Sequence, residues 1–162
     1  MRKVLISLVL AVSVSFGSFA VTIFYDNFDA NLPRLNGWKE SSSSYVTRYT
    51  GSYKIGSAAM QLKKSSNAVA YINISPYKDM RLSFKMAKYS LETGEKLLCQ
   101  YMTGTKWVTA ATLTNTAKSG VYYSYTVSIP TATTLKIRFI LNGSATNDYG
   151  YVDEVKLIGN RK

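Results

Sequence analysis

The stretch "NDYGYVDEVKLIGN", Asn147 to Asn160, lies almost at the end of the chain. It reads as a buried β-strand, yet it carries two adjacent acids, Asp153 and Glu154. Burying a carboxylate without a partner costs much free energy, so the acid that points inward needs either hydrogen bonds or a bound ion. The partner of this carboxylate is therefore either structural or part of the chemistry of the protein.

Alternation of apolar and polar residues runs through the rest of the chain, which is typical of β-strands with one buried face. The pattern is clearest in "MRLSFKM", "VYYSYTVSI" and "LKIRFIL". Further candidate strands are "TIFYDNF", "SYVTRY", "SAAMQL", "AVAYINI", "KLLCQYM", "WVTAATL" and "YVDEVKLI". About ten short strands, separated by Gly, Ser, Asn and Pro clusters, predict an all-β sandwich or barrel.

The first residues have the pattern of a secretory signal peptide. A positive start, Met1 to Lys3, precedes an apolar run over residues 4–16 and a small-residue site at Ser18-Phe19-Ala20. The run is shorter than the roughly 20 residues that span a bilayer, which disfavours a membrane anchor. We therefore predict a signal peptide over residues 1–20, one domain over residues 21–162, and a secreted or periplasmic location.

The charge balance narrows the class of partner. The chain has 20 Lys and Arg against 9 Asp and Glu, a formal charge of +11, and favours acidic partners. The basic residues are dispersed along strand faces, and export further disfavours a nucleic acid as ligand. Anionic glycans or cell-surface polymers fit the charge, and their binding should weaken with salt.

The residue composition gives little support for an enzymatic function. The chain has no histidine, which excludes histidine-based triads and the commonest transition-metal ligand. Cys99 is the single cysteine and is expected to be buried, and no intrachain disulfide can form. Four further acids, Glu40, Asp79, Glu92 and Glu95, show no paired-carboxylate pattern of a glycosidase. We predict that the protein is not an enzyme, with a polysaccharide lyase that uses Tyr and Arg as the less favoured alternative.

The order of the motifs resembles a known group of domains. "FYDNFD", "NGW", "YMTGTKWVTAATL", "LKIRFIL" and "DYGYVDEVKLIG" follow one another from Phe24 to Gly159. Together they resemble the jelly-roll sandwiches attached to secreted bacterial proteins, the carbohydrate-binding-module-like and MAM-like accessory domains. The chain departs from their closing "(I/V)D(D/N)V" at Glu154. The resemblance implies two antiparallel sheets in jelly-roll order and a non-catalytic module that binds carbohydrate.

The resemblance also implies a structural calcium ion where the first and last strands meet. Asp26, Asp29, Asp148 and Asp153 offer the carboxylate oxygens that calcium prefers. The alternative is that Asp153 accepts backbone N–H bonds or pairs with a basic side chain. The sequence leaves the two interpretations open.

The resemblance further predicts the binding face. It makes "KLLCQYM", "WVTAATL" and "LKIRFIL" neighbours in one sheet, with Gln100, Lys136 and Arg138 pointing outward. An Arg fork suits a carboxylate or phosphate on an acidic sugar, and Gln can donate and accept to hydroxyls. Tyr71 offers a stacking surface if its strand joins this sheet. The alternatives are that these side chains are merely solvated, or that the face binds a protein partner in an extracellular structural, adhesion or inhibitor role.

The thirteen tyrosines are the other prominent feature. Tyr101, Tyr123 and Tyr125 fall on apolar strand faces and are predicted to be core residues. The sequence favours exposure for four others, Tyr49, Tyr53, Tyr71 and Tyr122. Both tryptophans, Trp38 and Trp107, lie in motifs of the resembling domains and are assigned to packing. The sequence does not indicate an oligomeric state.

Overall fold

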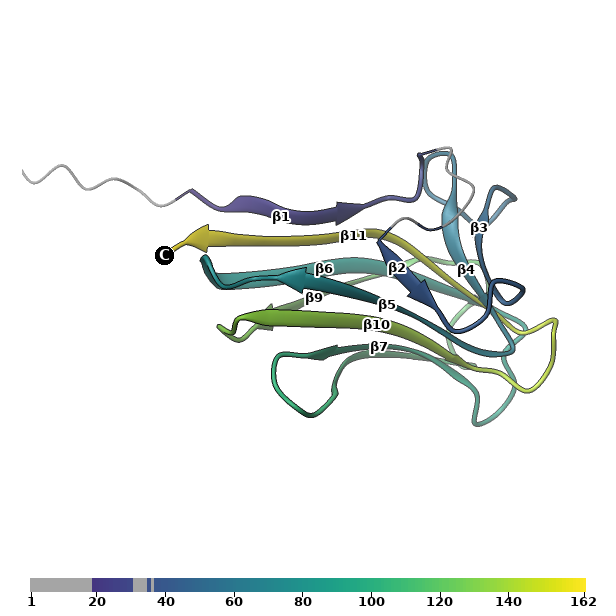
Figure 1. Ribbon diagram of the computed structural model, residues 1–162. Helices are drawn as coiled ribbons and strands as arrows, with labels where there is room; N and C mark the ends of the chain where they lie inside the picture. The colour runs from purple at the N-terminus through teal and green to yellow at the C-terminus, as the bar shows by residue number, and fades with distance from the viewer. Residues whose placement is uncertain (1–18, 31–34, 36) are drawn as a thin grey trace, which may run out of the picture.

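The computed structural model describes residues 19–30, 35 and 37–162 of the chain. The predicted signal peptide, residues 1–20, therefore lies almost wholly outside the described residues. The described part folds into eleven β-strands in two antiparallel sheets (Figure 1). This part contains no helix that is long and apolar enough to cross a membrane.

The larger sheet has six strands in the order β3-β4-β11-β6-β9, with β1 also pairing with β11. Its strands are β1 (Val21–Asp26), β3 (Val46–Tyr49), β4 (Ala59–Lys63), β6 (Tyr77–Tyr89), β9 (Tyr123–Ile129) and β11 (Tyr149–Arg161). Its centre is formed by the two thirteen-residue strands, β6 and β11, which pair along most of their length.

The smaller sheet has five strands in the order β2-β5-β10-β7-β8. Its strands are β2 (Trp38–Glu40), β5 (Ser65–Asn73), β7 (Lys96–Met102), β8 (Val108–Thr114) and β10 (Thr134–Asn142). All ten candidate strands are present, so the predicted sandwich of two antiparallel sheets is confirmed. The eleventh strand, β2, has three residues and follows Gly37, whose φ of 83° lies in the left-handed region that glycine adopts readily.

The core lies between the two sheets. Phe84 on β6 meets Phe139 on β10 edge to face, with ring centroids 5.4 Å apart. Trp38 packs against Phe139 and donates its indole N–H to the Asp26 carboxylate at 2.9 Å, which confirms its packing role. Cys99 is fully buried, as predicted. The apolar residues of the alternating strands thus form this core.

Strand β11 changes partner halfway along. Up to Val152 it pairs with β4, and from Val155 it pairs with β1. Between these positions the register against β6 shifts, and Glu154 has a left-handed φ of 49°. At this β-bulge, Asp153 and Glu154 pair with neither β4 nor β1.

Candidate functional site

The buried acid of the closing motif is satisfied by backbone donors. The Asp153 carboxylate accepts the N–H of Ile55 and the N–H of Glu154, each at 2.8 Å. It is fully buried, and this burial raises its pKa to about 6, although both hydrogen bonds oppose the shift. Asp153 is therefore an acceptor of backbone N–H bonds, as in the alternative to a calcium ligand.

Asp153 does not point into the core between the sheets. Its partner across the ladder is Lys85, whose side chain lies on the outer face of the six-stranded sheet. The segment of residues 50–57 covers Asp153 there, and Ile55 of this segment supplies the N–H. The neighbouring Glu154 turns outward and pairs with Lys85 at 2.7 Å. The two acids thus have different partners on the same side of the sheet.

Tyrosines pack between the covering segment and the sheet. Tyr53 packs against Tyr89 and Tyr151, with ring centroids 5.4 Å and 5.2 Å apart. Tyr122 donates its hydroxyl to the carbonyl of Tyr53 at 3.3 Å, and burial raises its pKa. Tyr49 also packs on Tyr151. Tyr49, Tyr53 and Tyr122 are therefore half-buried and less exposed than predicted, because residues 50–57 fold over a face that strand alternation assigns to solvent.

The structure separates Asp148 from the other predicted calcium ligands. Asp148 is buried just before β11 begins, where its carboxylate accepts the N–H of Ala145 at 2.6 Å. The extended chain from Asp148 to Asp153 spans about 16 Å at the usual rise of a strand. A single ion does not bridge that distance, so the separation disfavours Asp148 as a ligand of the same ion, and its role as a calcium ligand stays a prediction.

The other three carboxylates accept hydrogen bonds from N–H and O–H donors. Asp26 accepts the N–H of Phe28 and the indole N–H of Trp38. Asp29 accepts both the N–H and the hydroxyl of Ser57, and these bonds hold its pKa below the ordinary value. Within the described ranges, no three acidic, Cys or His side chains gather as a metal group would.

A cation of the chain itself lies at this corner. The Arg48 guanidinium donates from Nε to the carbonyl of Phe28 at 2.7 Å and from a terminal nitrogen to the carbonyl of Asp29 at 2.9 Å. As arranged, the corner does not fit calcium, because an ion would have to displace these donors. Calcium at Asp29 and Asp153 stays a prediction, and the hydrogen bonds favour the alternative.

The four predicted ligand-binding residues lie together on the outer face of the five-stranded sheet. Arg138 on β10 is opposite Gln100 on β7, and Lys136 on β10 is opposite Tyr71 on β5. All four positions alternate with core residues of their strands. The predicted neighbours β7, β8 and β10 share this sheet, and the strand of Tyr71 joins it.

The side chains on this face are held by one another. Arg138 donates from Nε and a terminal nitrogen to Gln100 Oε1 at 2.9 Å and 2.6 Å. Its guanidinium carbon lies 4.0 Å from the ring centroid of Trp107, and Gln100 donates to the Thr109 hydroxyl at 3.0 Å. The Lys136 ammonium lies 5.3 Å from the ring centroid of Tyr71, which is 60% exposed. We call Tyr71, Gln100, Trp107, Lys136 and Arg138 the basic-aromatic face.

Two of the residues here are absent from the predicted site. Trp107, assigned to packing by the sequence, is half-buried beneath Arg138, so its ring belongs to the basic-aromatic face. Lys39 on β2 stands opposite Val69, which is in turn opposite Arg138. Lys39 also lines a depression of about 410 Å³ at the β2 edge. The sequence signal for Trp107 was a single Trp in the predicted hairpin "YMTGTKWVTAATL". Lys39 had no such signal, because β2 is too short to show a strand period.

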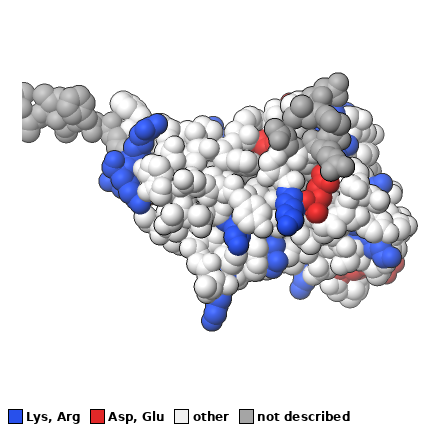
Figure 2. Space-filling model, in the orientation of Figure 1, with Lys and Arg blue, Asp and Glu red and all other residues white. Residues whose placement is uncertain are grey.

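Positive charge predominates on this side of the molecule. In Figure 1 strand β10 lies in front of β9, so the five-stranded sheet faces the viewer. Figure 2, in the same orientation, shows basic side chains spread along the visible surface and acidic groups confined to a few places. The face therefore combines aromatic surface with fixed N–H donors and positive charge.

Comparison with known proteins identifies the architecture. No protein-family model matches the chain, and no curated protein matches it in sequence. A solved structure of the carbohydrate-binding module TmCBM61 in complex with β-1,4-galactotriose is similar, with a TM-score of 0.66, 15% identity and coverage of 88% of this chain and 99% of that one.

Two further solved structures share the fold. The C-terminal family 22 carbohydrate-binding module of Clostridium thermocellum Xyn10B has a TM-score of 0.65 and 12% identity, with 86% of this chain and 94% of that chain covered. The K3 adhesin domain of Lys-gingipain from Porphyromonas gingivalis has a TM-score of 0.62 and 12% identity, with 86% and 99% covered. At these identities the likeness concerns the fold, and the chain has the β-sandwich fold of carbohydrate-binding modules.

Proposed function

We propose that this domain is a non-catalytic module that binds a carbohydrate or a cell-surface glycoconjugate on the basic-aromatic face. The observation that carries the proposal is the stacked and hydrogen-bonded position of Arg138 between Trp107 and Gln100. A guanidinium held in one plane loses little conformational entropy when a ligand binds. The face is thus organised before a ligand arrives.

The groups on this face suit a sugar with an acidic substituent. A guanidinium has five N–H donors, and within the described residues the bonds of Arg138 go to Gln100 alone. Lys136 adds a second positive charge beside the exposed ring of Tyr71. The ring can stack on the apolar face of a sugar while the cations meet a carboxylate, sulfate or phosphate.

The fold comparison supports a carbohydrate ligand. The similar solved structures include a module bound to β-1,4-galactotriose, a xylan-binding domain and a module that recognises mannan. Because an adhesin domain is also among the similar structures, a protein partner stays the alternative to a carbohydrate ligand. Export of the module, supported by the pattern of residues 1–20, is part of the proposal.

A glycan array on the mature protein, with neutral and acidic polysaccharides, tests the proposal. The double substitution Lys136→Ala with Arg138→Ala should lower affinity for the best array ligand by about 100-fold or more, since charged hydrogen bonds contribute about 1.5 to 3 kcal/mol each. The matched control is Lys78→Ala with Arg81→Ala, which removes the same charge from exposed positions of the six-stranded sheet. Equal affinity of both double variants and the parent would overturn this site.

The same material decides between binding and catalysis. A lyase would release unsaturated uronates from an acidic polysaccharide, and these absorb in the ultraviolet. We expect no such product after prolonged incubation, because the proposal gives Arg138 a role in binding alone. Accumulation of product that stops after Arg138→Ala would replace the binding proposal with the lyase.

A further inference from the structure

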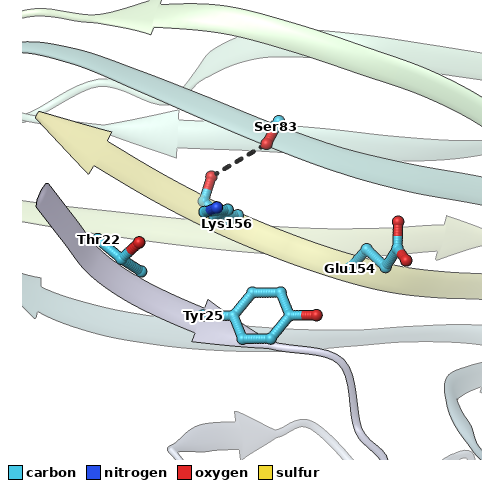
Figure 3. Close-up of a pocket in the computed structure, with 5 residues that line it drawn as sticks. All are labelled: Thr22, Tyr25, Ser83, Glu154 and Lys156. Carbon is cyan, nitrogen blue, oxygen red and sulfur yellow. Dashed lines mark hydrogen bonds between the residues drawn. The ribbon is translucent and has the colours of Figure 1, made fainter. Parts of the chain in front are cut away.

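A second polar depression lies on the opposite side of the sandwich. It measures about 340 Å³ and is lined by Thr22, Tyr25, Ser83, Glu154 and Lys156 (Figure 3). Tyr25 on β1 stands opposite Lys156 on β11, which stands opposite Ser83 on β6. Three strands therefore present one transverse row of side chains on the outer face of the six-stranded sheet.

The row has an aromatic ring at one end. Tyr25 is 52% exposed, although a ring of this size gains by burial. In Figure 3 its phenol projects along the sheet in the direction of Glu154. The ring thus forms one side of the depression and offers apolar area next to polar groups, as required to cover the C–H face of a sugar ring.

The polar groups around the depression are complementary. Glu154 accepts hydrogen bonds only, Lys156 donates only, and the hydroxyls of Thr22 and Ser83 do both. The left-handed backbone of Glu154 turns its side chain outward, where Lys85 holds it at 2.7 Å. Adjacent hydroxyls of a sugar can bridge such an acceptor and donor pair.

The charge here differs from that of the basic-aromatic face. Lys85 balances Glu154, so the ligand would meet a carboxylate as well as the Lys156 ammonium. The carboxylate accepts hydrogen bonds and the ammonium donates them, so the hydroxyls of an uncharged sugar ring can satisfy both groups. A volume above about 300 Å³ is within the range of small-ligand sites.

We propose that this depression is a second binding site, which takes a single uncharged sugar ring against Tyr25, with Glu154 and Lys156 bonding its hydroxyls. The two packed sheets, about 10 Å apart, separate it from Arg138. The two sites are occupied independently, so one domain can hold two chains or two parts of one chain. This site does not depend on the first one.

The test is an NMR titration of the mature, isotope-labelled protein with the methyl glycosides of glucose, galactose, mannose and xylose. We expect shifts of amide signals in β1, β6 and β11 for at least one of the four, unchanged between about 50 and 500 mM salt because the ligand is uncharged. Tyr25→Ala should weaken that binding about tenfold or more, and Tyr25→Phe should retain it because the ring remains.

The matched control is Tyr71→Ala, which removes an exposed tyrosine from the other sheet. It should leave these shifts unchanged and lower only the binding at the basic-aromatic face. Absence of shifts for all four glycosides overturns the second site, as does equal binding by Tyr25→Ala in a protein that melts normally. Loss of the shifts in Tyr71→Ala would assign the ligand to the first site and also overturn the second.

Discussion

The carboxylate of Asp153 accepts the backbone N–H of Ile55 at 2.8 Å, across 98 positions of the chain. The bond joins the segment of residues 50–57 to the long last strand at the point where that strand exchanges one neighbour for another. Tyr53 of the same segment packs on Tyr89 and Tyr151. The hydrogen bond of Asp153 therefore helps to hold residues 50–57, with Tyr53, against the outer face of the six-stranded sheet.

Asp153 should make stability depend on pH. Its pKa in the folded protein is about 6, above the ordinary value of 3.8, mainly because of burial. The folded state therefore binds more protons between these values, and the free energy of unfolding falls as pH rises from 4 to 6, by up to about 3 kcal/mol from this group. Its stabilisation is complete below about pH 3.8 and is lost above about pH 6.

Asp153→Asn should flatten this part of the profile, because the amide does not titrate. The measurement is urea unfolding at pH 4, 5, 6 and 7 for the parent and the variant. Asp79→Asn, at an exposed aspartate, removes the same charge and should keep the slope of the parent. An unchanged slope in Asp153→Asn would show that Asp153 is not the group responsible.

Arg48 should stabilise the corner between β1 and β3 without a metal ion. Arg48→Met leaves the carbonyls of Phe28 and Asp29 without these donors and should lower the free energy of unfolding by about 1 to 3 kcal/mol. Thermal melts with calcium and with chelator measure both effects. We expect chelator to leave the melting temperature of the parent unchanged.

A calcium-dependent rise of the melting temperature would instead support the ion predicted from the sequence. A ligand that binds only the folded state stabilises it by mass action. Asp29→Asn should then abolish the rise, and Asp148→Asn should leave it intact because Asp148 lies elsewhere. That outcome would require the Asp29 and Asp153 carboxylates to release the donors they hold here.

Arg138→Lys should weaken glycan binding although the charge is kept. Lys lacks the planar fork that bonds Gln100 and stacks on Trp107. We expect about a tenfold loss of affinity in isothermal titration calorimetry with the array ligand, and a change in stability within about 1 kcal/mol. Trp107→Phe, which keeps an aromatic ring, should lose less affinity than Trp107→Ala, and unchanged affinity in Trp107→Ala would remove Trp107 from the site.

The exported protein should begin at Val21. The pattern of residues 1–20 predicts cleavage after Ala20, and intact-mass analysis of secreted or periplasmic material measures it. Material that retains Met1 in a membrane fraction would contradict this prediction.

Much of the fold is readable from the sequence because strand periodicity is a local property. Alternation at every second residue identified ten strands, the burial of Cys99 and the outward direction of Lys136 and Arg138. Only the short β2 was missed, since three residues are too few for a period to show. These features depend on neighbours in the chain, which the sequence displays directly.

The sites were decided by tertiary structure. Tyr71 lies against Lys136 because β5 and β10 pair in one register, and a shift of one residue would have turned it away. Arg138 meets Trp107 because the connection between β7 and β8 brings the centroid of the indole ring to 4.0 Å from the guanidinium carbon. The partner of Asp153 is a backbone N–H, a donor that almost every residue carries, so no side-chain pattern could mark Ile55 in advance.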